Sequence, residues 1–157
     1  MQDIALNTDI LPTILAVNSS QTMQEEIKAI LSDYCRVIVS SNAVDALNLI
    51  YYEKVSLLLL DIVVPQLDGI EMCRTVRNMS QFYSLPIIML TARNKFVDRV
   101  KCKLAGANAY ITKPCEPQNL CEVVSHYLYS ESVEITSSSR SVKRVMGLEP
   151  TTFTLGR

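Results

Sequence analysis

Three polar residues, each directly after an apolar stretch of the chain, carry side chains that could act on a phosphate. Asp61 follows four leucines at 57–60, and Thr91 and Lys113 follow two further apolar stretches. A carboxylate can attack a phosphoryl phosphorus and form an acyl phosphate. A lysine ammonium can neutralise a phosphate oxygen, and a threonine hydroxyl can donate to another. Because phosphoryl transfer depends mainly on positioning and charge neutralisation, these three groups would suffice.

The apolar stretches have the character of buried strands. Four consecutive leucines are typical of a strand covered on both faces, as in parallel sheets. The predicted strands are 13–17, 35–39, 57–60, 86–90 and 109–112. Because the carboxyl ends of parallel strands meet at one edge of the sheet, Asp61, Thr91 and Lys113 can converge there.

Stretches with helical spacing separate these strands. Asn42 and Asp68 are suited to cap two of the helices, and Gly106 is suited to end another. The apolar positions that mark the helices are Met23, Ile27, Ile30 and Leu31; Ala43, Leu47 and Ile50; Ile70, Cys73 and Val76; Phe96, Val97, Val100 and Leu104; and Leu120, Val123, Val124, Tyr127 and Leu128. Five strands alternating with five helices predict a doubly wound five-stranded parallel α/β sheet in three layers.

Composition favours one domain in a reducing compartment. We expect a leader at 1–11, the domain at 12–130, and a disordered tail at 131–157, too short for an output domain. The net charge of -1 indicates no direct nucleic-acid partner, and no apolar run is long enough to indicate a membrane span. Five cysteines without a CxxC pair argue against a disulfide framework, so we expect a cytoplasmic protein.

The motifs in this order resemble the receiver domain of bacterial response regulators. The resemblance covers about residues 13–129 and implies a flavodoxin-like fold of the receiver type. The matching motifs are Leu60-Asp61 with Pro65 and Asp68-Gly69, Leu90-Thr91-Ala92, and Tyr110-Ile111-Thr112-Lys113-Pro114.

The resemblance implies a role for each site residue. Asp61 would accept a phosphoryl group from a sensor histidine kinase or a phosphotransfer protein in a two-component phosphorelay. Thr91 and Lys113 would bind that group, and Tyr110 would swing inward and alter the face used by an output partner, which the sequence does not identify. The Lys113–Pro114 peptide bond would be cis. Such a protein is a signalling module and not an enzyme.

One position departs from the family. Receivers carry two acidic residues after the first strand, where they hold Mg²⁺, but this chain has Asn18 and Ser19. With these, only Asp61 and the backbone carbonyl of Val63 remain of the usual ligands. Because Mg²⁺ favours carboxylate oxygens, we expect weak or absent Mg²⁺ binding and slow phosphorylation. The alternative function is a pseudo-receiver, an interaction module that works without phosphorylation.

Two further features bear on the reaction type and on dimerisation. Aspartate-dependent phosphatases place a second aspartate two residues after the nucleophile, where this chain has Val63, so that class is disfavoured. Receivers that dimerise through charged contacts carry acidic residues before the tyrosine, where this chain has Asn108 and Ala109. Dimerisation through another interface stays possible.

Overall fold

The strand of four leucines lies at the centre of a five-stranded sheet. The computed structural model of the protein describes residues 11–135. The elements are β1 (Thr13–Val17), α2 (Gln21–Leu31), β2 (Arg36–Ser40), α3 (Ala43–Tyr52), β3 (Leu57–Leu60), α4 (Gly69–Arg77), the short 3₁₀ helix η1 (Ser80–Phe82), β4 (Ile87–Thr91), α5 (Phe96–Ala105), β5 (Ala109–Thr112) and α6 (Pro117–Ile135). The sheet order is β2-β1-β3-β4-β5 with every pair parallel, which confirms the predicted fold class.

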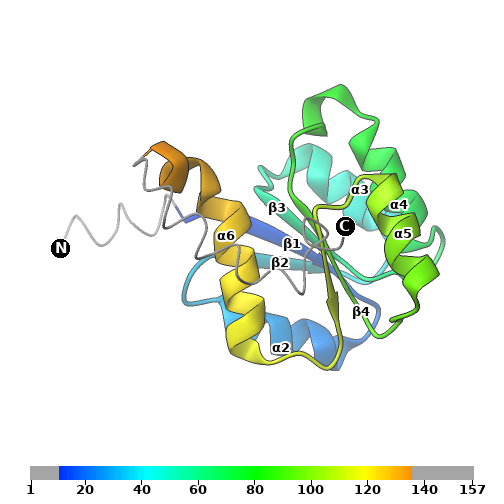
Figure 1. Ribbon diagram of the computed structural model, residues 1–157, viewed down its shortest axis with the longest axis horizontal. Coiled ribbons are helices and arrows are strands. Elements are labelled where there is room, and N and C mark those ends of the chain that lie inside the picture. The colour runs from blue at the N-terminus through cyan, green and yellow to red at the C-terminus, as the bar shows by residue number, and fades with distance from the viewer. Residues whose placement is uncertain (1–10, 136–157) are drawn as a thin grey trace.

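Helices cover both faces of the sheet (Figure 1). On one face α2 and α6 pack against Leu57 and Leu59, and on the other face α3, α4 and α5 pack against Leu58 and Leu60. Both faces of β3 are therefore buried, which explains why its sequence does not alternate with polar residues. Each buried leucine stabilises the fold by about 1.5–3 kcal/mol.

Three predicted helix boundaries are confirmed. Asn42 Oδ1 accepts a hydrogen bond from the Asp45 backbone N–H at 2.8 Å, and Asp68 Oδ1 accepts one from the Glu71 backbone N–H at 3.0 Å. Gly106 ends α5 with φ +109°, a left-handed conformation that favours glycine. These local signals are strong because a helix end has unpaired backbone groups that a suitable residue satisfies.

Two strands begin one residue later than the sequence predicts. β2 starts at Arg36 and β4 at Ile87. The Cys35 backbone N–H donates to the Leu31 carbonyl at 3.1 Å, so Cys35 closes the end of α2 instead of joining the sheet. Pro86 has no N–H to donate to a neighbouring strand, which accounts for the start of β4.

Most of the predicted leader and tail lies outside the described residues, at 1–10 and 136–157. α6 continues to Ile135, past residue 130, where the sequence pattern predicts that regular structure ends. Extending an existing helix adds one hydrogen bond per ordered residue, so a helix can continue without an apolar stripe. Between residues 11 and 135, no helix combines the length and apolarity that a bilayer span requires.

The helix α5 forms as predicted, but its large apolar side chains face away from the core. Phe96 is 78% exposed and Leu104 is 79% exposed. The other exposed apolar residues of this helix are Val97 and Val100. Its core-facing positions are Asp98, Cys102 and Ala105. The outer side of α5 is therefore an exposed apolar surface.

Arg77, at the end of α4, joins the segments that precede β4 and β5. Its guanidinium donates hydrogen bonds of 2.8–3.1 Å to the carbonyls of Phe82, Tyr83, Leu85 and Gly106 and to Asn108 Oδ1. Asn108 Oδ1 also accepts from the Ile87 backbone N–H at 2.8 Å. The Asn108 side chain, at a position where some receivers carry a dimer-forming acid, therefore contributes to the internal structure here.

We expect Arg77→Met to lower the free energy of unfolding by about 3 kcal/mol, because several carbonyls lose a charged donor. The matched control is Arg74→Met on the same helix. Arg74 forms only an exposed ion pair with Glu71, so its loss should cost less than about 1 kcal/mol. Urea denaturation measures both. Equal losses in the two variants would contradict the role assigned to Arg77.

Candidate functional site

Asp61, Thr91 and Lys113 lie at the carboxyl edge of the sheet. Asp61 follows β3, Thr91 is the last residue of β4, and Lys113 follows β5. Lys113 Nζ lies 2.9 Å from Asp61 Oδ2, and the Lys113 backbone N–H donates to the Thr91 carbonyl at 2.8 Å. The Lys113–Pro114 peptide bond is cis, as expected. The structure thus brings the Lys113 ammonium into contact with the Asp61 carboxylate. Strand β4, which ends at Thr91, lies between β3 and β5 in the sheet.

The Asp61 carboxylate is buried and accepts hydrogen bonds at both oxygens. Oδ2 accepts from Lys113 Nζ and, at 3.3 Å, from Asn18 Nδ2. Oδ1 accepts from the Val63 backbone N–H at 3.3 Å. A carboxylate in a buried site is stable only with such partners, and the bond from an ammonium is the strongest of them. The arrangement holds the Asp61 carboxylate in one orientation beside a cation.

Thr91 and Tyr110 are completely buried on neighbouring strands. Thr91 Oγ1 accepts from the Arg93 backbone N–H at 3.3 Å, and no hydrogen bond joins it to Asp61 within residues 11–135. The Tyr110 hydroxyl donates to the Arg93 carbonyl, so the ring points inward. Burial raises the pKa of the Tyr110 phenol to about 12. The ring therefore already occupies the inward position toward which the resemblance implies it would swing, and a switch formed by Thr91 and Tyr110 stays a prediction.

Two residues of this region were missed by sequence reasoning. Arg93 Nη2 forms a 2.7 Å ion pair with Asp98 Oδ1, and the Asp98 side chain is only 2% exposed. The hydrogen bond that Arg93 donates to the Asp98 carboxylate raises the pKa of the Arg93 guanidinium. A signal was present, because Asp98, Cys102 and Ala105 have helical spacing. The larger apolar residues on the opposite side of α5 concealed it.

Asn18 lies where receivers carry the first of their two acidic residues, and its side chain contacts the Asp61 carboxylate. It is 3% exposed, and its Oδ1 accepts from the Ser20 backbone N–H at 2.9 Å. Because that bond orients the amide, Nδ2 points at Asp61 as a donor. Ser19, the second replacement, is exposed. Where receivers carry two carboxylates, this chain places a hydrogen-bond donor and a surface hydroxyl.

These residues do not fit a tight Mg²⁺ site. Asp61 supplies the single carboxylate, and the side-chain oxygen of Asn18 is already bonded to Ser20. In the described part of the chain, no group of three or more His, Cys, Asp or Glu side chains could hold a metal ion. Of the expected ligands, the Val63 carbonyl and the Ser19 hydroxyl are neutral and weaker partners for this hard cation.

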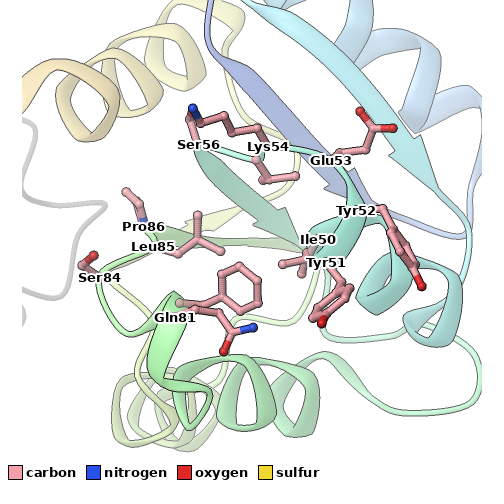
Figure 2. Close-up of a pocket in the computed structure, with 12 residues that line it drawn as sticks. Ile50, Tyr51, Tyr52, Glu53, Lys54, Ser56, Gln81, Ser84, Leu85 and Pro86 are labelled. Atoms are coloured by element: carbon pink, nitrogen blue, oxygen red, sulfur yellow. The ribbon is translucent and has the colours of Figure 1, made fainter.

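A hollow of about 670 Å³ lies at the opposite edge of the sheet (Figure 2). It borders Ser56 and Pro86, which precede β3 and β4, and the end of α3 at Tyr51 and Tyr52. The two tyrosine rings meet edge to face at 5.2 Å between centroids. None of the residues predicted to act on a phosphate lines this hollow.

Comparison with known proteins agrees with this geometry. Residues 14–125 match the family model of the response regulator receiver domain. The response regulator Rre1 of Synechocystis is 29% identical over 83% of this chain, and the match spans 58% of the length of Rre1. Protein PilG of Pseudomonas aeruginosa is 29% identical over 74% of this chain and 87% of PilG.

Solved structures show the same architecture. The crystal structure of a putative response regulator from Chloroflexus aurantiacus superposes with a TM-score of 0.72 and 33% sequence identity. The match covers 75% of this chain and 98% of the Chloroflexus chain. The observed sheet and its covering helices are therefore those of a known group of signalling domains.

We expect Asn18→Asp with Ser19→Asp to bind Mg²⁺ at least about tenfold more tightly than the wild-type protein, because two carboxylates join Asp61. Isothermal titration of Mg²⁺ measures both proteins. Gln81→Asp with Ser84→Asp is the matched control, since it adds the same charge at exposed positions near the opposite edge of the sheet. Equal and tight Mg²⁺ binding by the wild type and the Asn18/Ser19 variant would refute the argument from missing acids.

Proposed function

The chain belongs to the response regulator receiver domains of two-component signalling, and from this premise we propose that Asp61 accepts a phosphoryl group from the histidine of a partner protein. The partner would be a sensor histidine kinase or a phosphotransfer protein in the cytoplasm. The observation that carries the proposal is the buried Asp61 carboxylate with Lys113 Nζ at 2.9 Å. The protein would be a stoichiometric acceptor in this relay and not a turnover enzyme.

The transfer needs one nucleophile and one cation. An Asp61 oxygen attacks the phosphorus of the phosphohistidine, the P–O bond forms as the P–N bond breaks, and the imidazole leaves with the electron pair. The Lys113 ammonium stays beside the new acyl phosphate and neutralises one of its oxygens. The Thr91 hydroxyl is an acceptor in its described hydrogen bond, so its proton can donate to another phosphoryl oxygen.

The output would pass through the surface formed by α5, β5 and the start of α6. Tyr110 lies in β5 beneath this surface, and Arg99 of α5 lies over its ring. The exposed Phe96 and Leu104 provide apolar area at which a partner can bind. A change in Thr91 and Tyr110 would alter the packing of α5 and hence this surface.

The second candidate function, a pseudo-receiver, is supported by the Asn18 amide. Its Nδ2 donates to Asp61 Oδ2, the same oxygen that Lys113 contacts. This bond reduces the number of lone pairs available for attack and takes the place of a metal ligand. In this candidate the domain would bind its partner through the same surface without phosphorylation.

Acetyl phosphate with Mg²⁺ should label the protein with one phosphoryl group, slowly, because only one acid remains in the site. Intact mass spectrometry under non-denaturing conditions detects the label. Asp61→Asn should abolish it. Asp68→Asn, which changes a nearby exposed acid that caps α4, should retain it.

The same experiment separates the two candidate functions. A label that persists in Asp61→Asn would overturn the assignment of the acceptor. A wild-type protein that stays unlabelled while Asn18→Asp with Ser19→Asp is labelled would favour the pseudo-receiver, because the phosphoacceptor itself would then be competent.

A further inference from the structure

Asp98 is a buried charge that the proposed phosphoryl chemistry does not use. It lies on the core-facing side of α5 and is 2% exposed. Its two oxygens face one guanidinium, with Arg93 Nη2 2.7 Å from Oδ1 and Arg93 Nε 3.4 Å from Oδ2. Because a buried carboxylate without a partner is strongly destabilising, this pair constrains where Arg93 lies.

Arg93 lies in the loop between β4 and α5, and three parts of it have different partners. The side chain binds Asp98, the backbone N–H donates to Thr91 Oγ1 at 3.3 Å, and the carbonyl accepts from the Tyr110 hydroxyl. Fixing the Arg93 side chain therefore also fixes the backbone groups that Thr91 and Tyr110 use. One residue joins the loop, the end of β4 and the ring on β5.

A second arginine covers the Tyr110 ring. Arg99 Cζ lies 4.9 Å from the ring centroid, and Arg99 Nη2 lies 3.4 Å from Thr112 Oγ1. The ring is completely buried, and a buried phenol requires a hydrogen-bond partner. The Arg93 carbonyl accepts a hydrogen bond from the Tyr110 hydroxyl, so displacement of the Arg93 backbone would break that bond.

We propose that the ion pair between Arg93 and Asp98, and not Asp61, holds Tyr110 in its buried position. We call Arg93, Asp98, Arg99 and Tyr110 together the Arg93 clamp. The contacts that define the clamp do not include Asp61. Asp98 is thus a positioning residue that acts through Arg93, and the shape of the α5–β5 surface depends on Asp98 more than on the state of Asp61.

The proposal goes beyond the phosphoacceptor function and does not require it. If Asp61 is phosphorylated, the clamp sets the state from which the change begins. If Asp61 is never phosphorylated, the clamp keeps the surface of α5 in one conformation, to which a partner can bind. In both cases the position of Tyr110 is decided by a charge pair inside the fold.

Fluorine NMR of the full chain labelled with 3-fluorotyrosine tests the clamp. The chain has seven tyrosines, and Tyr110→Phe identifies the Tyr110 signal. The shift of that signal between H₂O and D₂O reports whether the ring meets solvent. We expect a shielded ring in the wild type and in Asp61→Asn. In Asp98→Asn the solvent-exposed population should rise at least about tenfold, as the loss of a charged hydrogen bond implies.

Two more variants complete the test. Arg93→Lys keeps the positive charge beside Asp98 but loses the bidentate contact of the guanidinium. We therefore expect it to expose the Tyr110 ring as well. It replaces Asp98→Asn in the test if that variant does not fold. Glu71→Gln, which breaks the exposed pair with Arg74, is the control and should leave the signal unchanged. Cooperative thermal unfolding shows that each variant is folded.

A shielded Tyr110 ring in folded Asp98→Asn or, where that variant is unfolded, in folded Arg93→Lys would overturn the proposal. Equal exposure in Asp61→Asn would also overturn it, because the ring would then depend on Asp61. These outcomes are independent of labelling by acetyl phosphate. A protein that accepts no phosphoryl group would refute the proposed function and leave the clamp intact.

Discussion

The ion pair between Asp61 and Lys113 is the interaction on which the site depends. Its two side chains are 10% and 18% exposed, so both charges have lost most of their water. Removing charges from water is costly, and only well-fixed geometry recovers that cost. The parallel strands fix the positions of the two side chains, because β3, β4 and β5 end at the same edge of the sheet. The Lys113 backbone N–H also donates a hydrogen bond to the Thr91 carbonyl.

The single amide of Asn18 changes the electrostatics of this pair. In a receiver with two further acids, the carboxylates repel one another, and a bound cation relieves the repulsion. Here one carboxylate faces one ammonium and one neutral donor. We infer that the site is nearly neutral, so a substitution that would weaken metal binding would also reduce the need for a divalent cation.

A second charge pair, between Arg93 and Asp98, lies just after Thr91 along the chain and has a different character. Asp98 is buried on the core-facing side of α5. In our proposals the first pair would offer an oxygen for phosphoryl transfer, and the second would orient the loop that contains Arg93. Thr91 connects the two charge pairs. Its carbonyl accepts a hydrogen bond from the Lys113 backbone N–H, and its hydroxyl oxygen accepts one from the Arg93 backbone N–H. A chemical event at one pair can thus reach the other through one residue.

The sequence by itself determined the alternation of strands and helices, the caps at Asn42, Asp68 and Gly106, and the convergence of Asp61 and Lys113. These features follow from local backbone chemistry and from the rule that parallel strands end together. Only the tertiary structure decided that Asp98 lies inside while Phe96 and Leu104 lie outside, and that Asn18 donates to Asp61. Those outcomes depend on partners distant along the chain or contributed by a loop, because a buried carboxylate is stable only where a guanidinium reaches it.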